Sequence, residues 1–378
     1  MTSVPSEPPV QRAADPERDL LARQLVLRHG WNSTVYQLMN PDMQHWFAPG
    51  GDALVGYVEH LGVRVVAGAP VAAYERLPQV AQAFEDDARR HGLATCYFAV
   101  EPRWLELVGR RAEAALVGAQ PVWDAAAWES AVHTHASLRA QFNRARNKGV
   151  SVVRQSVSGL APDAPGAAEL TALRERWSAA HGLPPLGFLT GVDLVPRDSG
   201  LLDAMSEDRR LYVARRSGAA VGYLVASPIP LREGWLVEQV VRDPRAPNGT
   251  SELLIDAAAR DLAQAGARRL TLGLSPLSRR HRPASLERRD TPAWTRAAFA
   301  WAYAHGRRFY DFAGVETFKE KFRPPRWEPV YLVAGGARLS PRTLYAVAAA
   351  FTGGRPLVTL GRGVLRAYGP RRPARSAA

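Results

Sequence analysis

The sequence predicts an α/β protein built from a duplicated structural unit. Two stretches of the 378-residue chain repeat one order of elements, in which alternating apolar strands precede a helix and a further strand follows it. The chain also exceeds the length that one hydrophobic core usually supports, and its 46% apolar content is ordinary for a globular protein. Because the residues of the two stretches barely match, the repetition concerns the order of elements, and it predicts two domains.

The chain begins with a segment of low order, and the first helix follows it. Residues 1–14 are rich in proline, serine and alanine and are expected to form a disordered arm. Asp15 and Pro16 then supply an N-cap and a first helical residue, and Gly30 marks the end of the predicted helix. The first domain is therefore expected over residues 15–155.

Strands and helices alternate through the rest of this domain. The runs HWFAP, ALVGYVEH and VRVVAG are predicted strands, and Leu61 and Gly62 form the turn between the last two. A helix from Leu77 to His91 and the strand ATCYFAV follow. The long polar helix SLRAQFNRARNKG and the strand VSVVRQS are expected to end the domain.

The second domain, expected over residues 156–335, repeats this order. The runs RLYVARR, AVGYLVAS and WLVEQVV are predicted strands, a helix follows from about Thr250 to Gln264, and RRLTLGL is the next strand. Together, the two domains predict mixed sheets that helices flank.

Positive charge is concentrated towards the C-terminal end. The formal net charge is +13, and no aspartate or glutamate follows Pro329. Residues 336–378 form a basic, partly amphipathic tail with the apolar stretches LYAVAAAF and PLVTLGRGVLRAYG. Such a segment is expected either to lie on an anionic membrane surface or to form a packing helix followed by a frayed basic terminus. Its positive charges are Arg338, Arg342, Arg355, Arg362, Arg366, Arg371, Arg372 and Arg375.

Several classes of protein are disfavoured by what the sequence lacks. No apolar run approaches the roughly 18 residues of a membrane-spanning helix, and the start MTSVPSEPPV does not resemble a signal peptide, so a cytoplasmic protein is expected. The single Cys96, inside the apolar run ATCYFAV, indicates a buried core thiol, and no metal site is expected. The usual hydrolase, kinase, metalloprotease and dinucleotide-binding motifs are absent.

One candidate site lies in the segment VEQVVRDPRAPNGTSELLIDAAARDLAQAG. A predicted strand leads through a turn rich in proline and glycine into a helix that Thr250 or Ser251 is expected to cap, with Glu252 and Asp256 in its opening turns. The start of such a helix presents unpaired backbone N–H groups, which a phosphate or a developing oxyanion needs. The simpler interpretation is a tight turn followed by a capped helix.

A second candidate site lies in the segment FYDFAGVETFKEKFRPPRWEPVYLV. The chain has only three lysines, and two of them, Lys319 and Lys321, fall here. Because they are two apart, their side chains diverge by about 200° on a helix, and only one needs to face a site. The alternative is a solvated charged face, although the flanking Phe318, Phe322 and Trp327 favour partial burial.

The strings RDPRAPNGTSELLID, LTLGLSPLS and YDFAGVETFKEKFRPPRWEPVYL, in this order, resemble the phosphatidylglycerol lysyltransferase C-terminal domain family. In the first half, LGVRVVAGAPVA and PVWDAAAWESAVHTHASLRAQFNRARNKGV are similar to the same family. The likeness covers roughly residues 30–335 and is to a stand-alone member without the family's membrane flippase portion. It implies tandem acetyltransferase-like (GNAT) domains.

The resemblance also assigns roles to residues of both segments. Glu238 is expected to receive the substrate ammonium. Two structural roles remain as alternatives, namely an ion pair between Glu238 and Arg242 and a helix cap at Asp311. The expected catalytic residues are Lys319, Lys321 and Glu238; substrate is expected at Arg242, Asn248, Gly249, Thr250, Glu252, Asp311 and Arg326; and tRNA or lipid phosphate is expected at Arg139, Arg144, Arg146 and Lys148.

The implied reaction moves a lysyl-like amino acid from aminoacyl-tRNA to a hydroxyl of a membrane lipid such as phosphatidylglycerol. Direct attack of that hydroxyl on the aminoacyl ester needs no covalent enzyme intermediate, and no cofactor is expected beside the aminoacyl-tRNA. The expected partners are aminoacyl-tRNA and an anionic lipid surface, with the protein peripheral at the inner face of the membrane. Two other functions stay open: an acyl-coenzyme A-dependent N-acyltransferase, and an inactive module that binds nucleic acid or membrane.

Overall fold

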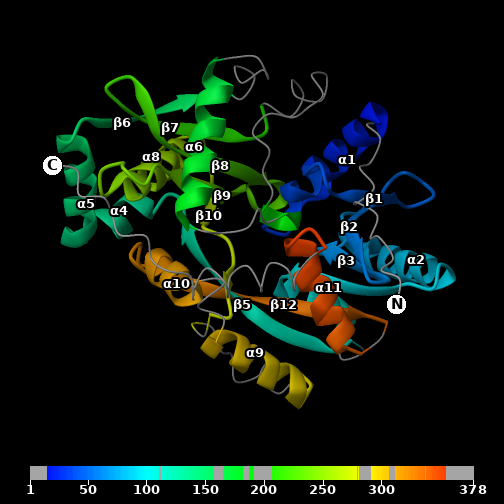
Figure 1. Cartoon of the computed structure of the whole chain (residues 1–378). Coiled ribbons are helices and arrows are strands. Elements are labelled where there is room, and N and C mark those ends of the chain that lie inside the picture. Colours follow the sequence, from blue (N-terminus) through cyan, green and yellow to red (C-terminus); the bar gives the residue numbers. More distant parts are fainter. Residues whose placement is uncertain are drawn as a thin grey trace, which may run out of the picture.

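Twelve strands form one mixed sheet that runs through the whole computed structural model, with helices packed along it (Figure 1). The strand order is β1-β2-β3-β4-β12-β5-β10-β9-β8-β7-β6, and β11 pairs with β5. The structure describes residues 15–109, 112–156, 165–181, 187–190, 207–278, 280, 291–305, 311–336 and 338–354. The expected arm over 1–14 and most of the expected tail, 355–378, lie outside the described residues.

The first half of the sheet begins with an antiparallel meander, and a crossover helix then adds a parallel strand. The crossover helix is α2 (Leu77–Arg90). Its buried residues Val80, Phe84 and Ala88 recur every four positions, so they form one apolar face, which packs on the sheet. The elements are α1 (Pro16–His29), η1 (Val35–Met39), β1 (Gln44–Phe47), β2 (Leu54–His60), β3 (Val63–Ala67), η2 (Tyr74–Arg76), α2 (Leu77–Arg90), β4 (Ala94–Val100) and α3 (Pro102–Val108).

The second half repeats this plan. Four antiparallel strands, β6 to β9, lead into a crossover helix, α8, and β10 then pairs parallel with β9. The elements are α4 (Trp128–His133), α5 (Ala136–Asn147), β6 (Val150–Gln155), α6 (Pro165–His181), η5 (Phe188–Thr190), β7 (Arg210–Arg216), β8 (Ala219–Ile229), η6 (Pro230–Arg232), β9 (Gly234–Arg242), α8 (Thr250–Gln264), β10 (Arg269–Thr271), β11 (Ser275–Pro276), α9 (Ala293–His305) and α10 (Phe312–Glu320).

Topology corrects the expected boundary near residue 155. β6 pairs with β7, and α5 packs on α8, so both elements belong to the second unit although the sequence analysis assigned them to the first. Pattern alone predicted that these elements exist, but it could not show which sheet they join, because pairing is a long-range property.

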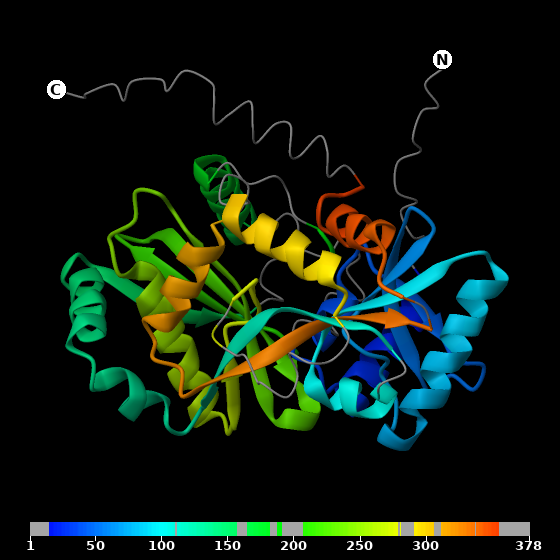
Figure 2. The same cartoon turned by 90° about the horizontal axis from the view of Figure 1, so that it is seen from below.

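The two units exchange their last strands. β5 (Ala114–Asp124) ends the first unit yet pairs antiparallel with β10 of the second, and β12 (Arg326–Gly335) ends the second unit yet pairs antiparallel with β4 of the first. β5 and β12 also pair with each other, and Figure 2 shows them as two long strands that cross from one half to the other. The second domain was expected to end at residue 335, but its last strand, β12, pairs with a strand of the first unit.

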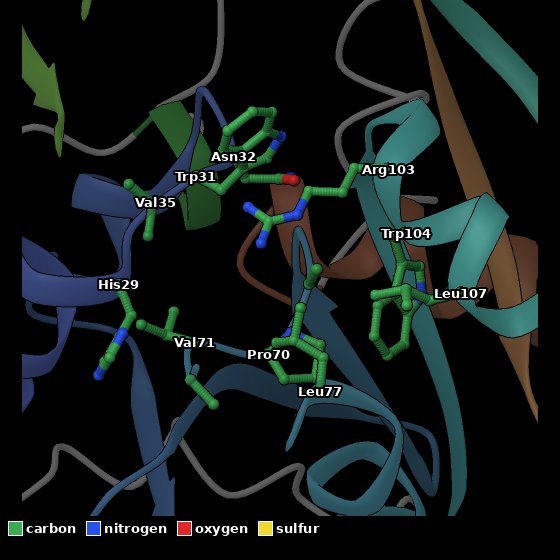
Figure 3. Close-up of a pocket in the computed structure, with 12 residues that line it drawn as sticks. His29, Trp31, Asn32, Val35, Pro70, Val71, Leu77, Arg103, Trp104 and Leu107 are labelled. Carbon is green, nitrogen blue, oxygen red and sulfur yellow. The ribbon is translucent and has the colours of Figure 1, made fainter. Parts of the chain in front are cut away.

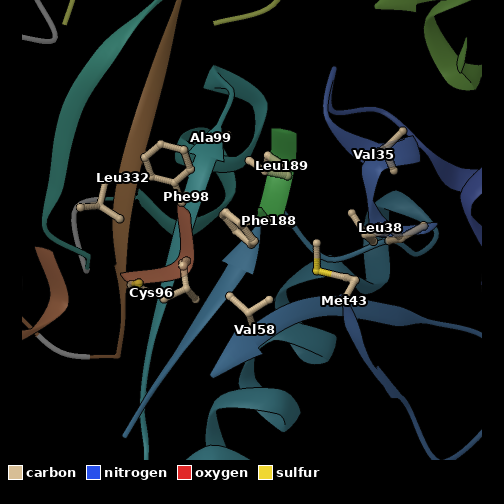
Figure 4. Close-up of a cluster of buried hydrophobic side chains, with 14 of the residues drawn as sticks. Val35, Leu38, Met43, Val58, Cys96, Phe98, Ala99, Phe188, Leu189 and Leu332 are labelled. Carbon is tan, nitrogen blue, oxygen red and sulfur yellow. The ribbon is translucent and has the colours of Figure 1, made fainter. Parts of the chain in front are cut away.

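A hydrophobic cluster formed by both halves of the chain fixes this arrangement. Phe188 packs edge-on against Phe351, and each also contacts Phe98 of β4. Burial raises the pKa of the Cys96 thiol in this cluster to about 12, which confirms Cys96 as a core residue. Members labelled in Figure 4 are Val35, Leu38, Met43, Val58, Cys96, Phe98, Ala99, Phe188, Leu189 and Leu332.

The described part of the expected tail is a packing helix. α11 (Pro341–Phe351) is capped by Ser340, whose side chain accepts a hydrogen bond from Thr343 N–H. Ala346 and Ala350 are buried in the cluster that Figure 4 shows, so the apolar face of α11 covers the protein's own sheet. This confirms the packing alternative for these residues.

Local predictions at the start of the chain also hold. Asp15 caps α1 and accepts a hydrogen bond from Arg18 N–H, and Pro16 is the first helical residue.

Across the described ranges, no helix combines the length and the apolar character that a bilayer span requires.

Candidate functional site

Helix α8 starts without a side-chain cap. Its N-cap is Gly249, at φ +95°, and no side chain accepts a hydrogen bond from the first turn. The expectation that Thr250 or Ser251 caps the helix is wrong, because Thr250 is already helical and its Oγ1 donates to the Pro247 carbonyl at 2.7 Å. The Thr250 N–H donates to the Pro247 carbonyl at 3.3 Å, so it is the N–H groups of Ser251 and Glu252 that face an anion without a side-chain cap.

A glycine is required at this position for two reasons. Its positive φ is costly for other residues, and a Cβ there would lie 2.1 Å from the backbone oxygen of Gln141. Gly249 thus lets α5 approach the start of α8 closely, which places the basic face of α5 beside the uncapped helix end.

A pocket of about 350 Å³ opens at this junction of α5, α8 and α10. Six of the predicted site residues line it, although the sequence places them in three separate segments. Gln141, Ser251 and Phe318 line it as well but were not among the predicted site residues. The lining residues are Gln141, Arg144, Arg242, Asn248, Gly249, Ser251, Glu252, Phe318 and Lys321.

The pocket carries three cations and one carboxylate. Lys321 Nζ donates to Glu252 Oε1 at 3.3 Å, while Arg242 Nη1 donates to Asn248 Oδ1 at 3.3 Å. The side chain of Lys321 is 47% exposed and that of Glu252 only 9%, so the carboxylate holds the ammonium at the pocket mouth. With Arg144, these groups leave a positive site that suits a phosphate.

Two buried tryptophans position the end of α10 and hence Lys321. Trp123 Nε1 donates to the carbonyl of Phe322 at 3.1 Å, and the Phe322 ring stacks on Trp128 with centroids 5.8 Å apart. Trp128 Nε1 in turn donates to Asp256 Oδ1 at 3.2 Å. Sequence reasoning missed both tryptophans. A buried indole N–H usually has a hydrogen-bond acceptor, but the sequence does not show which acceptor it reaches.

Lys319, the other predicted catalytic lysine, lies outside this pocket. Its Nζ donates to the carbonyls of Gly273 and Leu274, both at 2.8 Å, and burial lowers its pKa to about 7. The two lysines diverge as their spacing predicted, and only Lys321 faces the pocket. Lys319 instead ties α10 to the chain just after β10.

The depressed pKa of Lys319 predicts a pH-dependent stability. The unfolded chain binds the proton of Lys319 up to pH about 10.4, whereas the folded chain releases it near 7, so the free energy of unfolding should rise between these pH values. The slope from this group is at most about 1.4 kcal/mol per pH unit. Denaturant titrations from pH 6.5 to 9.5 should show a smaller slope for Lys319→Met; equal slopes would contradict a proton released near 7.

Glu238 lies on the same strand as Arg242 but at a β-bulge. Val225 of β8 pairs with Gln239 and the next residue, Ala226, pairs with Val237, so Glu238 is the extra residue. A bulge takes one residue out of the ladder and redirects its side chain. On its other side, β9 has no partner among the described strands at Glu238, because the pairing of β9 with β10 covers Gly234 to Leu236 and ends there.

The Glu238 carboxylate is fully buried and only half satisfied. Oε2 accepts a short hydrogen bond from Ser227 and lies 3.6 Å from Arg209 Nε, while Oε1 has no hydrogen-bond partner among the described residues. The partners of Glu238 are thus Ser227 and Arg209, and not Arg242 as the structural alternative had it. An unpaired buried carboxylate oxygen is costly, and a bound ammonium or N–H donor would remove that cost.

The remaining predicted residues have other surroundings. Asp311 caps α10 by accepting from Gly314 N–H at 3.0 Å, which confirms the structural alternative. Arg326 lies 3.2 Å from Glu328 on β12, and Arg146 lies 3.8 Å from the buried Asp256; neither lines the pocket. Arg139 on α5 and Lys148 just after it are exposed and lie outside the pocket lining.

The equivalent turn of the first unit is closed to a phosphate. The pocket beside it, near Pro70 and Leu77, holds only about 20 Å³, and Figure 3 shows the Arg103 side chain extending towards Trp31. The guanidinium of Arg103 lies 4.3 Å from the ring centre of Trp31, and Pro78 removes an N–H group from the start of α2. Of these two turns, the one in the second unit therefore offers the larger site for an anion.

No metal centre is apparent in the part of the chain that the structure describes, where no three His, Cys, Asp or Glu side chains gather suitably. The site consists of the anion pocket at Arg242 and of the buried Glu238 carboxylate, which lies four residues earlier on β9.

The chain is similar to proteins of lysylphosphatidylglycerol synthesis. It is 28% identical over 235 residues to a lysylphosphatidylglycerol biosynthesis bifunctional protein of Nocardia farcinica, an alignment that covers 61% of this chain and 20% of the relative. It is 24% identical over 340 residues to one from Mycobacterium sp. (strain JLS), covering 88% and 30%. The chain thus spans under a third of the length of these curated relatives.

Solved structures show the same fold. The C-terminal domain of a putative lysylphosphatidylglycerol synthetase from Agrobacterium fabrum has a TM-score of 0.72 at 21% identity, covering 90% of this chain and 99% of that one. L-PGS from Bacillus licheniformis has a TM-score of 0.69 at 19% identity, covering 98% and 99%. The expected α/β fold of tandem acetyltransferase-like units, with a mixed sheet flanked by helices, is confirmed.

The match to a protein family spans most of the chain. The family described as "Phosphatidylglycerol lysyltransferase, C-terminal" matches residues 23–334, which include the anion pocket, Glu238 and both exchanged strands. The chain therefore belongs to the family of phosphatidylglycerol lysyltransferase C-terminal domains.

Proposed function

We propose that this chain transfers an aminoacyl group, lysyl or similar, from aminoacyl-tRNA to a hydroxyl of a membrane lipid such as phosphatidylglycerol. The observation that carries the proposal is the alignment on one strand of an anion pocket at Arg242 and a buried, half-satisfied carboxylate at Glu238. Four strand residues span about 13 Å, a length on the scale of a nucleotide that carries an aminoacyl ester.

In this proposal the pocket receives phosphate of the tRNA 3′ end. The uncapped start of α8 supplies backbone N–H groups, and Arg144, Arg242 and Lys321 supply charge. The aminoacyl group then extends along β9 towards Glu238, whose unpaired Oε1 accepts a hydrogen bond from an ammonium group of the amino acid.

The reaction is a direct exchange of esters. The lipid hydroxyl attacks the aminoacyl carbonyl, a new carbon–oxygen bond forms, the bond to the tRNA ribose breaks, and the ribose oxygen takes the proton. Positioning supplies much of the rate, because the tRNA ester already carries the driving force. The backbone N–H released by the bulge at Glu238 is a candidate donor to the transient oxyanion.

The test is to incubate the protein with radiolabelled aminoacyl-tRNA and phosphatidylglycerol vesicles and then to chromatograph the extracted lipids. A labelled lipid that is lost after ribonuclease treatment supports the proposal and identifies the amino acid. Absence of label with every charged tRNA would contradict it.

Lys321→Ala is expected to lower kcat/KM for this transfer about 10- to 100-fold, because one phosphate-binding charge is lost. The melting temperature should change little, since an ion pair that is half exposed contributes at most about 1 kcal/mol. Arg268→Ala, which removes a far more exposed cation paired with Glu233, is the matched control and should leave transfer unchanged. Equal effects of both variants would indicate that general charge, and not the pocket, matters.

A second candidate is acyl transfer from coenzyme A to an amine. The uncapped start of α8 favours it as well, because a pyrophosphate fits the same N–H groups. Thermal stabilisation by coenzyme A without any response to aminoacyl-tRNA would support this alternative.

A further inference from the structure

Helix α9 presents an apolar face to solvent. Arg296 is its one polar residue among those exposed, and Trp301 is 63% exposed and Trp294 37%. The exposed residues are Ala293, Trp294, Arg296, Ala297, Ala300 and Trp301; side chains 302–305 lie outside this description.

The position of the tryptophans is selective. The chain has ten tryptophans, all within the described ranges, and the two exposed ones both stand on α9. They are seven residues apart, which is close to two helical turns, so they lie on one face. Two large apolar side chains exposed at this spacing form a surface of the kind that binds a partner or a membrane.

The other face of α9 anchors the helix. Thr295 is fully buried, and Phe299, four residues later, packs against the cluster shown in Figure 4. Figure 2 shows α9 lying across the outside of the sheet beside α11, with α10 next along the chain. The tryptophan face is therefore held outward by the fold.

We propose that α9 is the surface through which the protein docks on an anionic lipid bilayer. Tryptophan favours the boundary between lipid headgroups and acyl chains, where its ring is apolar and its N–H stays hydrated. An amphipathic helix with an apolar face of this kind lies in that boundary plane. The inference rests on the proposed function, since a lipid acceptor has to be reached at a bilayer.

Charge favours an anionic surface. Arg296 is exposed on the tryptophan face, and α9 has no acidic residue. Each basic residue near an anionic bilayer adds about 1 kcal/mol of attraction. A partner protein would need a matching acidic and apolar surface, and the membrane supplies both over a wide area.

Placement relative to the pocket fits this orientation. α10 follows α9 in the sequence, and Figure 2 shows the two helices close to each other on the same side of the sheet; Lys321, which lines the pocket, directly follows α10. The apolar face of α11, by contrast, is already buried on β2 and β3 and is not free to insert.

Cosedimentation of the full chain with vesicles of phosphatidylglycerol and phosphatidylcholine tests the docking surface. Replacing both tryptophans, Trp294→Ala with Trp301→Ala, is expected to weaken vesicle binding roughly 10- to 100-fold. The control pair, Leu231→Ala with Val153→Ala, removes side chains that are 45% and 44% exposed elsewhere and should bind as the unmodified protein does. Unchanged binding of the double tryptophan variant, with an unchanged melting temperature, would overturn the inference.

Fluorescence separates insertion from a loss of folding. Vesicles with brominated acyl chains should quench the emission of the unmodified protein, and the quenching should disappear in the variant Trp294→Phe with Trp301→Phe, which keeps an apolar face. Persistent quenching in that variant would place the contact at another tryptophan and refute α9 as the docking surface.

Transfer assays distinguish this inference from the proposed function. With short-chain phosphatidylglycerol below its aggregation concentration, the double alanine variant should retain the activity of the unmodified protein, while its activity on vesicles falls. If the unmodified protein transfers no amino acid to either lipid, the proposed function fails, yet vesicle binding still decides the role of α9.

Discussion

Replacing Glu238 by glutamine is expected to lower kcat/KM for transfer of a cationic amino acid by at least about 100-fold. The buried carboxylate would lose its charge, and a desolvated ion pair with a substrate ammonium contributes about 3–5 kcal/mol when one partner is removed. Steady-state transfer assays with lysyl-tRNA and with a neutral aminoacyl-tRNA measure the effect, and the neutral substrate should be affected far less.

Glu101→Gln is the matched control for this experiment. Glu101 is also a buried carboxylate beside an arginine, Arg232, but both of its oxygens already have partners, one of them Ser33 N–H. The variant should keep its transfer activity even if its melting temperature falls. A loss of transfer for Glu101→Gln equal to that for Glu238→Gln would show that buried charge in general, and not a substrate contact, is being measured.

The second large effect is expected from Gly249→Ala. The new Cβ would lie 2.1 Å from the backbone of Gln141, and a positive φ adds about 1 kcal/mol of strain, so α5 has to move away from α8. We expect the free energy of unfolding to fall by about 2–4 kcal/mol and binding of tRNA to weaken at least tenfold, since Arg144 moves with α5. Denaturant titration and filter binding provide the two measurements.

Gly266→Ala tests the backbone strain alone. Gly266 follows α8 at φ +90°, nearly the same conformation as Gly249, but nothing lies within 4 Å of a Cβ there. It should lose only about 1 kcal/mol of stability and keep its affinity for tRNA. Equal losses in both variants would mean that close approach of α5 is not what Gly249 provides.

Much of the fold followed from the sequence because its elements are marked locally. Asp15 and Pro16 mark the start of α1, and the alternation in ALVGYVEH and VRVVAG marks a hairpin, so both were predicted correctly. The exchange of β5 and β12 was not predicted. Both strands are apolar on their buried faces, and such a pattern is satisfied equally well beside either neighbour.

The candidate site was predicted in part. Arg242, Asn248 and Glu252 lie in one pocket because they belong to a strand-to-helix turn that is recognisable in sequence, and Lys321 reaches the same pocket from the end of α10. The capping glycine was misjudged because Thr250 and Ser251 are better cap formers by propensity, and close packing on Gln141 decides otherwise. Lys319 could not be separated from Lys321 without knowing which helix face is buried.

The strand exchange has a consequence for synthesis on the ribosome. β12 begins 226 residues after β4 ends (326 − 100), so at about 5–20 residues per second the edge of β4 waits roughly 10–45 seconds for its neighbour. An unpaired edge next to a forming apolar core is a template for pairing between nascent chains. Neither half can be completed until the other has been translated, which makes this protein dependent on protection of its first half during translation and unsuited to expression as two separate pieces.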